Sequence, residues 1–135
     1  MTSSGEGEAQ VLVVALGGTL LGQDPLTGKI LWKRDVHRFG NPLALVVTPT
    51  AIYAAGLDQL VRLDYPSGEL RWAARVPRGR NMLLLQGQRL YVGGAGEVAC
   101  FTLDGKLVWH EPFKGQGRPA VALGFPGNVV QADYE

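Results

Sequence analysis

The sequence has a single cysteine and no apolar run long enough to cross a bilayer. Cys100 has no second cysteine for an intramolecular disulfide, so nothing indicates an oxidising compartment. The longest apolar run, residues 11–22, is too short for a membrane helix. The residues before it include two glutamates and no lysine or arginine, unlike a secretory signal. We therefore expect residues 1–8 to form a flexible polar tail and the protein to be cytoplasmic.

Net charge is small, and the patterns of common catalytic and metal sites are missing. The formal net charge is +1, so the sum of charges attracts neither nucleic acid nor a membrane surface. The two histidines, His37 and His110, are far apart, and no Cys/His spacing fits zinc. No Gly-x-x-x-x-Gly-Lys phosphate loop occurs, and the glycine-rich residues 93–96 read as a hairpin turn. No serine or cysteine is paired with a base.

Glycine and proline, in contrast, are abundant. Nineteen glycines and eight prolines in 135 residues indicate many turns, and many turns indicate short strands. No segment shows a sustained 3.6-residue apolar period, so we predict almost no helix. Apolar residues make up 46% of the chain, which is enough for a core. The sequence therefore predicts an all-β domain over residues 9–135.

Three tryptophans mark an internal repeat. They are 40 and 37 residues apart, and each lies four residues after a glycine, in the pairs Gly28–Trp32, Gly68–Trp72 and Gly105–Trp109. β-rich segments precede each pair, and each unit reads as four short strands. A four-stranded antiparallel unit that repeats every 40 residues or so is typical of a β-propeller blade. We predict three blades, at about residues 11–36, 43–76 and 82–112.

The strings around the tryptophans resemble the repeat of pyrroloquinoline-quinone (PQQ)-like β-propellers, Ala-x-Asp-x-x-[Thr/Ser]-Gly-x-x-x-Trp. The first two copies carry Asp24 and Asp64 at the aspartate position, whereas the third has Thr102 there and is one residue shorter. The resemblance covers nearly the whole chain. It implies that the tryptophan docks against the neighbouring blade and that the aspartate and glycine hold the turn. The residues with this structural role are Asp24, Gly28, Trp32, Asp64, Gly68, Trp72, Gly105 and Trp109.

The resemblance also raises the question of enzyme activity, because PQQ-dependent dehydrogenases share this repeat. Those enzymes are implied to have seven or eight blades, a calcium site, a catalytic aspartate and often a disulfide between adjacent cysteines. The chain has no Cys-Cys pair, and its aspartates lie mostly in repeat turns. We therefore expect no catalytic residues, no metal site and no cofactor, and we do not expect an enzyme.

Three blades do not close a ring, since propellers have roughly four to eight. The first blade begins with its second strand, residues 11–16, and lacks an innermost strand. Residues 120–123 supply a surplus strand of the innermost type, and residues 128–132 then duplicate the first strand. This pattern predicts a six-bladed ring closed by a homodimer, in which one of the duplicated strands must fray, cap an edge or be displaced. A truncated piece of a larger propeller is the alternative.

The linkers that leave the outer strands are basic. Each linker runs inward to the next blade, so all three are expected on one rim. The residues of this basic rim are Lys33, Arg34, His37, Arg38, Arg75, Arg78, Arg80, Lys114 and Arg118. Solvated loop charge, partly offset by Asp35 and Glu111, is the plainer interpretation.

The favoured hypothesis for function is a non-catalytic scaffold that binds an acidic protein partner through the basic rim. Binding of nucleic acid or polyphosphate by the same rim is the alternative. It is less favoured because the only aromatic residues in these linkers are Phe39 and Phe113.

Overall fold

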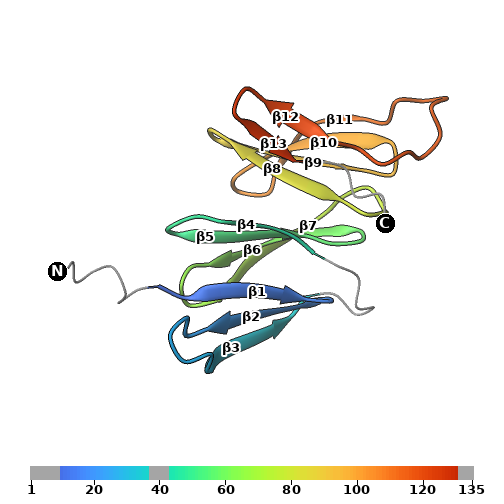
Figure 1. Ribbon diagram of the computed structural model, residues 1–135. Helices are drawn as coiled ribbons and strands as arrows, with labels where there is room; N and C mark the ends of the chain where they lie inside the picture. Colours follow the sequence, from blue (N-terminus) through green and yellow to red (C-terminus); the bar gives the residue numbers. More distant parts are fainter. Residues whose placement is uncertain (1–9, 37–42, 131–135) are drawn as a thin grey trace.

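The computed structural model describes residues 10–36 and 43–130, and all regular structure in this part of the chain is β (Figure 1). The first sheet has three strands, β1 (Leu12–Leu16), β2 (Thr19–Gln23) and β3 (Ile30–Asp35). The second has four, β4 (Ala44–Val47), β5 (Ala51–Ala55), β6 (Gln59–Asp64) and β7 (Leu70–Arg75). The third also has four, β8 (Met82–Gln86), β9 (Arg89–Gly94), β10 (Glu97–Thr102) and β11 (Leu107–Glu111). Among the described residues, no helix is long and apolar enough to cross a membrane.

Each sheet is an antiparallel meander in which strands that are consecutive in sequence are hydrogen-bonded neighbours. The sheets stack face to face as successive blades, with the first at the bottom of Figure 1 and the third at the top. The predicted all-β architecture of propeller blades is confirmed. Within the described part of the chain, the first blade has three strands in place of the four of a complete blade, and the strand that it lacks there is the innermost one.

The surplus segment at the C-terminal end differs from the prediction in its boundaries. The strand expected over residues 120–123 is β12 (Leu123–Phe125), which pairs with β13 (Asn128–Val130). The turn between these strands has two residues, because Phe125 pairs with Asn128 and only Pro126 and Gly127 lie between them. Gly127 adopts the φ of 75° that this tight turn requires. Residues 131 and 132 of the expected second strand lie outside the described residues.

The repeat glycines close the turns between the third and fourth strands. Gly68 adopts a φ of 75° and its N–H donates to the carbonyl oxygen of Asp64 at 2.9 Å. In the third turn the N–H of Gly105 donates in the same way, at 3.0 Å, to the carbonyl oxygen of Thr102, which stands in place of the aspartate. Its hydroxyl oxygen accepts a hydrogen bond from the N–H of Lys106 at 3.1 Å. The hydroxyl thus supports a turn that is one residue shorter.

The core lies between the blades and not within any one of them. Every residue of β5 is buried, because β5 faces a blade on each side. Ile52 and Ala54 belong to a cluster shared with Leu20 of the first blade. Tyr53 and Ala55 belong to a second cluster shared with the third blade. The second blade is therefore the centre of the described structure.

Candidate interaction surface

The first two repeat tryptophans join neighbouring blades in the same way. The indole N–H of Trp32 donates to the carbonyl oxygen of Pro66 at 2.8 Å, and that of Trp72 donates to the carbonyl oxygen of Leu103 at 3.1 Å. In both cases the acceptor residue lies two positions before the turn glycine of the next blade. A Cβ atom on Gly68 would lie 2.5 Å from the ring of Trp32, so the indole packs directly on the glycine. We call this arrangement the Trp–turn contact.

Trp109 does not make this contact, so the implication that each repeat tryptophan docks against a neighbouring blade is wrong for it, whereas Trp32 and Trp72 are half-buried. Its side chain is 45% exposed, and β11 is exposed along its whole length. The physical reason is that no glycine turn of a following blade is present among the described residues to receive the indole. At the other end of the stack, the turn of Gly28 receives no tryptophan, and a Cβ there would meet nothing within 4 Å.

The linkers between blades are anchored at the turns that join the second and third strands. The N–H of Gly79 donates to the carbonyl oxygen of Leu57 at 2.7 Å, and the N–H of Gly96 donates to that of Pro119 at 2.8 Å. Asn81, which is 4% exposed, donates from its side-chain amide to the carbonyl oxygens of Gly56 and Pro77, both at 2.8 Å. The sequence analysis missed Asn81, although a lone asparagine inside an arginine-rich linker was a usable signal.

Three arginines belong to two linkers that a hydrogen bond joins at this end of the blades. The guanidinium of Arg118 donates to the carbonyl oxygen of Arg78 at 2.6 Å. Arg80 and Arg118 also line one shallow hollow together with Gly79 and Ala95. The side chains of all three arginines are exposed. We call Arg78, Arg80 and Arg118 the arginine cluster.

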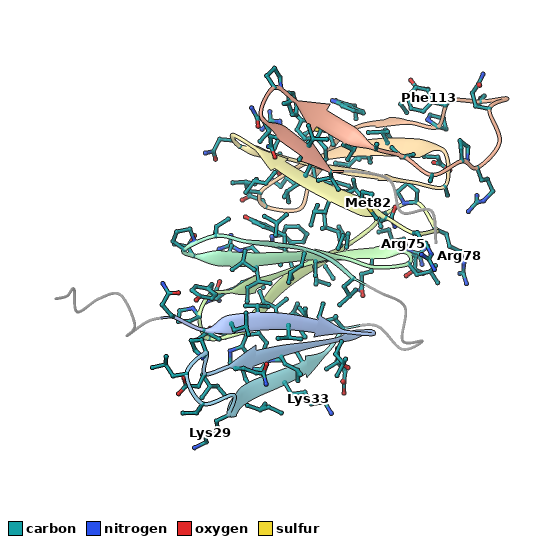
Figure 2. The ribbon with its side chains drawn as sticks, viewed as in Figure 1. Lys29, Lys33, Arg75, Arg78, Met82 and Phe113 are labelled. Carbon is teal, nitrogen blue, oxygen red and sulfur yellow. The ribbon has the colours of Figure 1, made fainter. Side chains whose placement is uncertain are left out.

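The other residues of the predicted basic rim are dispersed. Arg34 lies between the blades, where its Nε donates to the carbonyl oxygen of Gly68 at 2.9 Å and its guanidinium lies over the ring of Trp32. Lys33 is exposed on β3, and Lys114 is exposed in the linker after β11. Figure 2 shows Lys33 on the first blade, away from Arg75 and Arg78. His37 and Arg38 lie outside the described residues.

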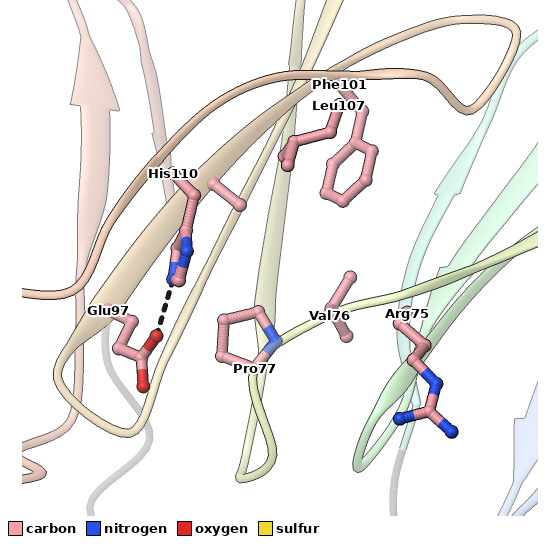
Figure 3. A pocket seen from close by; sticks show the side chains of 8 residues that line it. Arg75, Val76, Pro77, Glu97, Phe101, Leu107 and His110 are labelled. Carbon is pink, nitrogen blue, oxygen red and sulfur yellow. Dashed lines mark hydrogen bonds and ion pairs between the residues drawn. The ribbon is translucent and has the colours of Figure 1, made fainter.

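Arg75 borders a pocket of about 230 Å³ between the second and third blades (Figure 3). The floor of the pocket is apolar, with Val76 and Phe101 among its residues. On one side, Nε2 of His110 lies 2.5 Å from a carboxylate oxygen of Glu97. His110 is therefore hydrogen-bonded, and Glu97 is a partner that the sequence analysis did not single out. Within residues 10–36 and 43–130, no group of three or more His, Cys, Asp and Glu side chains could hold a metal ion.

Cys100 is buried in β10. It is 1% exposed, and this burial raises the pKa of its thiol above the ordinary value. We expect a thiol reagent such as Ellman's reagent to modify Cys100 at least ~100-fold more slowly in the native chain than in 6 M guanidinium chloride, because both the access to the thiol and its thiolate fraction are low. Equal rates would show that β10 opens readily.

The comparison with protein families agrees with this architecture. The model of the family described as outer membrane protein assembly factor BamB, a PQQ-like repeat family, matches residues 16–134. The chain belongs to this family. This match confirms the resemblance to PQQ-like propellers over residues 16–134, nearly the whole chain. The comparison with curated proteins returned no match.

Solved structures share the fold of this BamB-family chain at low sequence identity. BamB from Moraxella catarrhalis is 18% identical with a TM-score of 0.61, over 85% of this chain and 36% of that protein. The computationally designed Ika8 protein is 18% identical with a TM-score of 0.67, over 85% of this chain and 37% of the designed protein. A europium-containing methanol dehydrogenase is 16% identical with a TM-score of 0.59, over 74% of this chain and 22% of that enzyme. The chain thus spans about a third of the length of the BamB structure.

Proposed function

We propose that the chain is a non-catalytic scaffold that binds a protein with an acidic surface through the arginine cluster. The observation that carries the proposal is the hydrogen bond from Arg118 to the backbone of Arg78, which brings two linkers 40 residues apart in sequence onto one patch. The family supports a protein partner, because it is described as a factor in the assembly of another protein. The cytoplasmic location stays a prediction.

The backbone around the cluster is held in place, so an acidic partner meets arginines whose main-chain positions are already set. The hydrogen bonds of Gly79 and Asn81 tie the second linker to the turn of its own blade, and the hydrogen bond between Gly96 and Pro119 ties the third. A guanidinium binds a carboxylate through two parallel hydrogen bonds, which makes arginine better suited than lysine to such a surface. Preorganised donors lose less entropy on binding.

Reversing the charge of the cluster is expected to weaken binding of an acidic peptide. We predict that the triple variant Arg78→Glu, Arg80→Glu, Arg118→Glu binds a decaglutamate probe at least ~10-fold less tightly in isothermal titration, which corresponds to about 1.4 kcal/mol. Lys106→Glu is the matched control, because Lys106 is exposed but follows a turn glycine away from the linkers. Circular dichroism checks that both variants keep the β fold. An equal loss in the control would refute a special role for the cluster.

Nucleic acid is the other anionic ligand that the cluster could contact. The same titration with a DNA duplex at several salt concentrations separates the two ligands. For phosphate contacts, the logarithm of the binding constant falls linearly with the logarithm of the salt concentration. We expect weak duplex binding whose plot of log K against log salt has a slope no steeper than about −3, because the cluster has three cations. Tight, steeply salt-dependent duplex binding that is lost in the triple variant would favour nucleic acid over a protein partner.

A further inference from the structure

The chain carries one unmatched half of the Trp–turn contact at each end of the blade stack. Trp109 is an indole without a turn, and the turn of Gly28 has no indole. The filled contacts show what the empty turn lacks. Gly68 is buried under Trp32, whereas Gly28 is exposed although its φ of 80° is close to the 75° of Gly68. The backbone of the empty turn therefore already has the conformation that receives an indole.

We propose that these two halves meet between two copies of this chain. Trp109 of one copy packs on Gly28 of the other, and its indole N–H donates to the carbonyl oxygen of Leu26. Leu26 is the residue two positions before the turn glycine, as Pro66 and Leu103 are in the two filled contacts. Leu26 is 89% exposed, so none of the described residues of its own chain covers this turn.

The charges next to the two halves are complementary. At the filled contact between the first two blades, the residue two positions after the tryptophan is Arg34, which donates to the carbonyl oxygen of Gly68. The residue that follows Gly68 is Glu69, whose carboxylate lies 3.4 Å from Arg71 of its own blade. The second filled contact has Ala74 and Lys106 at these two positions, whereas the open ends hold Glu111 and Lys29, which carry opposite charges. Both residues are exposed in the single chain.

Glu111 lies on the correct face for this pairing. The strand β11 places Trp109 opposite Cys100 and Glu111 opposite Val98, so both side chains project to the same side of the third blade. His110 projects to the other side, toward the second blade, where it lines the pocket with Val76. Trp109 and Glu111 therefore face outward together, as the contact requires.

Two copies related by a twofold axis satisfy both open ends at once. Each copy supplies one tryptophan and one turn, and the six blades fall within the four to eight that close a propeller. In the closed ring β12 takes the innermost position of the partner's first blade, next to the partner's β1. The β1 strand pairs with β2 at five positions and packs Val13 and Ala15 against a core cluster, whereas β13 pairs at only three positions. The closed ring therefore keeps β1 and displaces β13.

The test is the mass of the 135-residue chain in sedimentation, with charge variants at the proposed contact. At about 50 μM, a concentration above the dissociation constant of any stable interface of standard size, we expect the wild-type chain to sediment at twice the 14.5 kDa of one chain. Trp109→Ala, Lys29→Glu and Glu111→Lys are each expected to sediment as single chains, while the control Lys106→Glu stays paired. A single-chain mass for the wild-type protein, or a series of masses above two chains, would overturn the proposal.

Mixing the two charge variants gives a sharper test. In a pair formed by one Lys29→Glu chain and one Glu111→Lys chain, both contacts bring opposite charges together, although each variant repels a copy of itself. We expect the equimolar mixture, and also the double variant Lys29→Glu, Glu111→Lys, to regain the mass of two chains. Recovery also shows that the single variants are folded. A mixture that stays at the mass of one chain contradicts the pairing. The measurement uses no acidic probe, so its outcome is independent of the proposed scaffold function.

Discussion

Replacing Trp72 by alanine is expected to lower the free energy of unfolding by about 3 kcal/mol or more. Trp72 joins the second and third blades through its hydrogen bond to Leu103 and its packing on Gly105, and its ring also lies 6.3 Å from that of Tyr53. Truncation leaves a cavity between the blades and an unpaired carbonyl group. This loss is a large share of the free energy of unfolding of an ordinary domain, which is about 5–15 kcal/mol in total.

The measurement is urea unfolding followed by far-UV circular dichroism, a signal that does not depend on which tryptophans a chain carries. Both chains carry Trp109→Ala, so that association between copies does not enter the free energy of unfolding. The difference between the Trp109→Ala chain with and without Trp72→Ala then reports the seam between the second and third blades. A difference below about 1 kcal/mol would be little more than the effect of an ordinary surface substitution. It would show that the indole contact contributes little and that the core clusters alone hold the blades together.

Replacing Gly68 by valine is expected to cost about 3 kcal/mol or more, from two separate causes. The first is strain, because a side chain at a φ of 75° is disfavoured. The second is a clash, because the new Cβ would lie 2.5 Å from ring carbons of Trp32. Overpacking of this kind costs roughly 1–3 kcal/mol, and the indole has to leave the turn to relieve it.

Gly28→Val is the matched control for the clash. Gly28 has nearly the same φ, but a Cβ there meets nothing within 4 Å. In the Trp109→Ala background, Gly28→Val therefore bears the strain alone, and Gly68→Val is expected to be less stable than it by at least about 1 kcal/mol. Equal destabilisation would mean that backbone strain accounts for the whole effect and that Trp32 does not depend on the glycine.

The spacing of the tryptophans predicted the blades well because it reflects a contact that recurs between successive blades. Each Gly-x-x-x-Trp string forms a local turn and strand, and Trp32 and Trp72 lie as the repeat implies. Trp109 follows the same string but is exposed, because its burial depends on a turn outside its own blade. The pattern within a repeat therefore identifies the side chain that docks, whereas the presence of a receiving surface is decided elsewhere.

The basic rim was predictable only as a set of charged linkers. Arg34 and Lys33 are adjacent in sequence, but the alternation of side chains along β3 places Arg34 between the blades and Lys33 in solvent. Arg78 and Arg118 are 40 residues apart and are joined by a hydrogen bond that no local pattern contains. The pairing of Glu97 with His110 depends likewise on the register of β10 and β11.

The sequence by itself determined the class of fold, the three blade repeats and the residues that close each turn, because strand alternation, positive-φ glycines and docking tryptophans are written in short strings. Only the tertiary structure decided which tryptophans are covered, which arginines converge and which turn stands empty. Those outcomes depend on how blades stack, and stacking brings together residues that are distant in the chain. The unmatched Trp109 and Gly28 belong to this second kind, since each is defined by what the neighbouring surface holds.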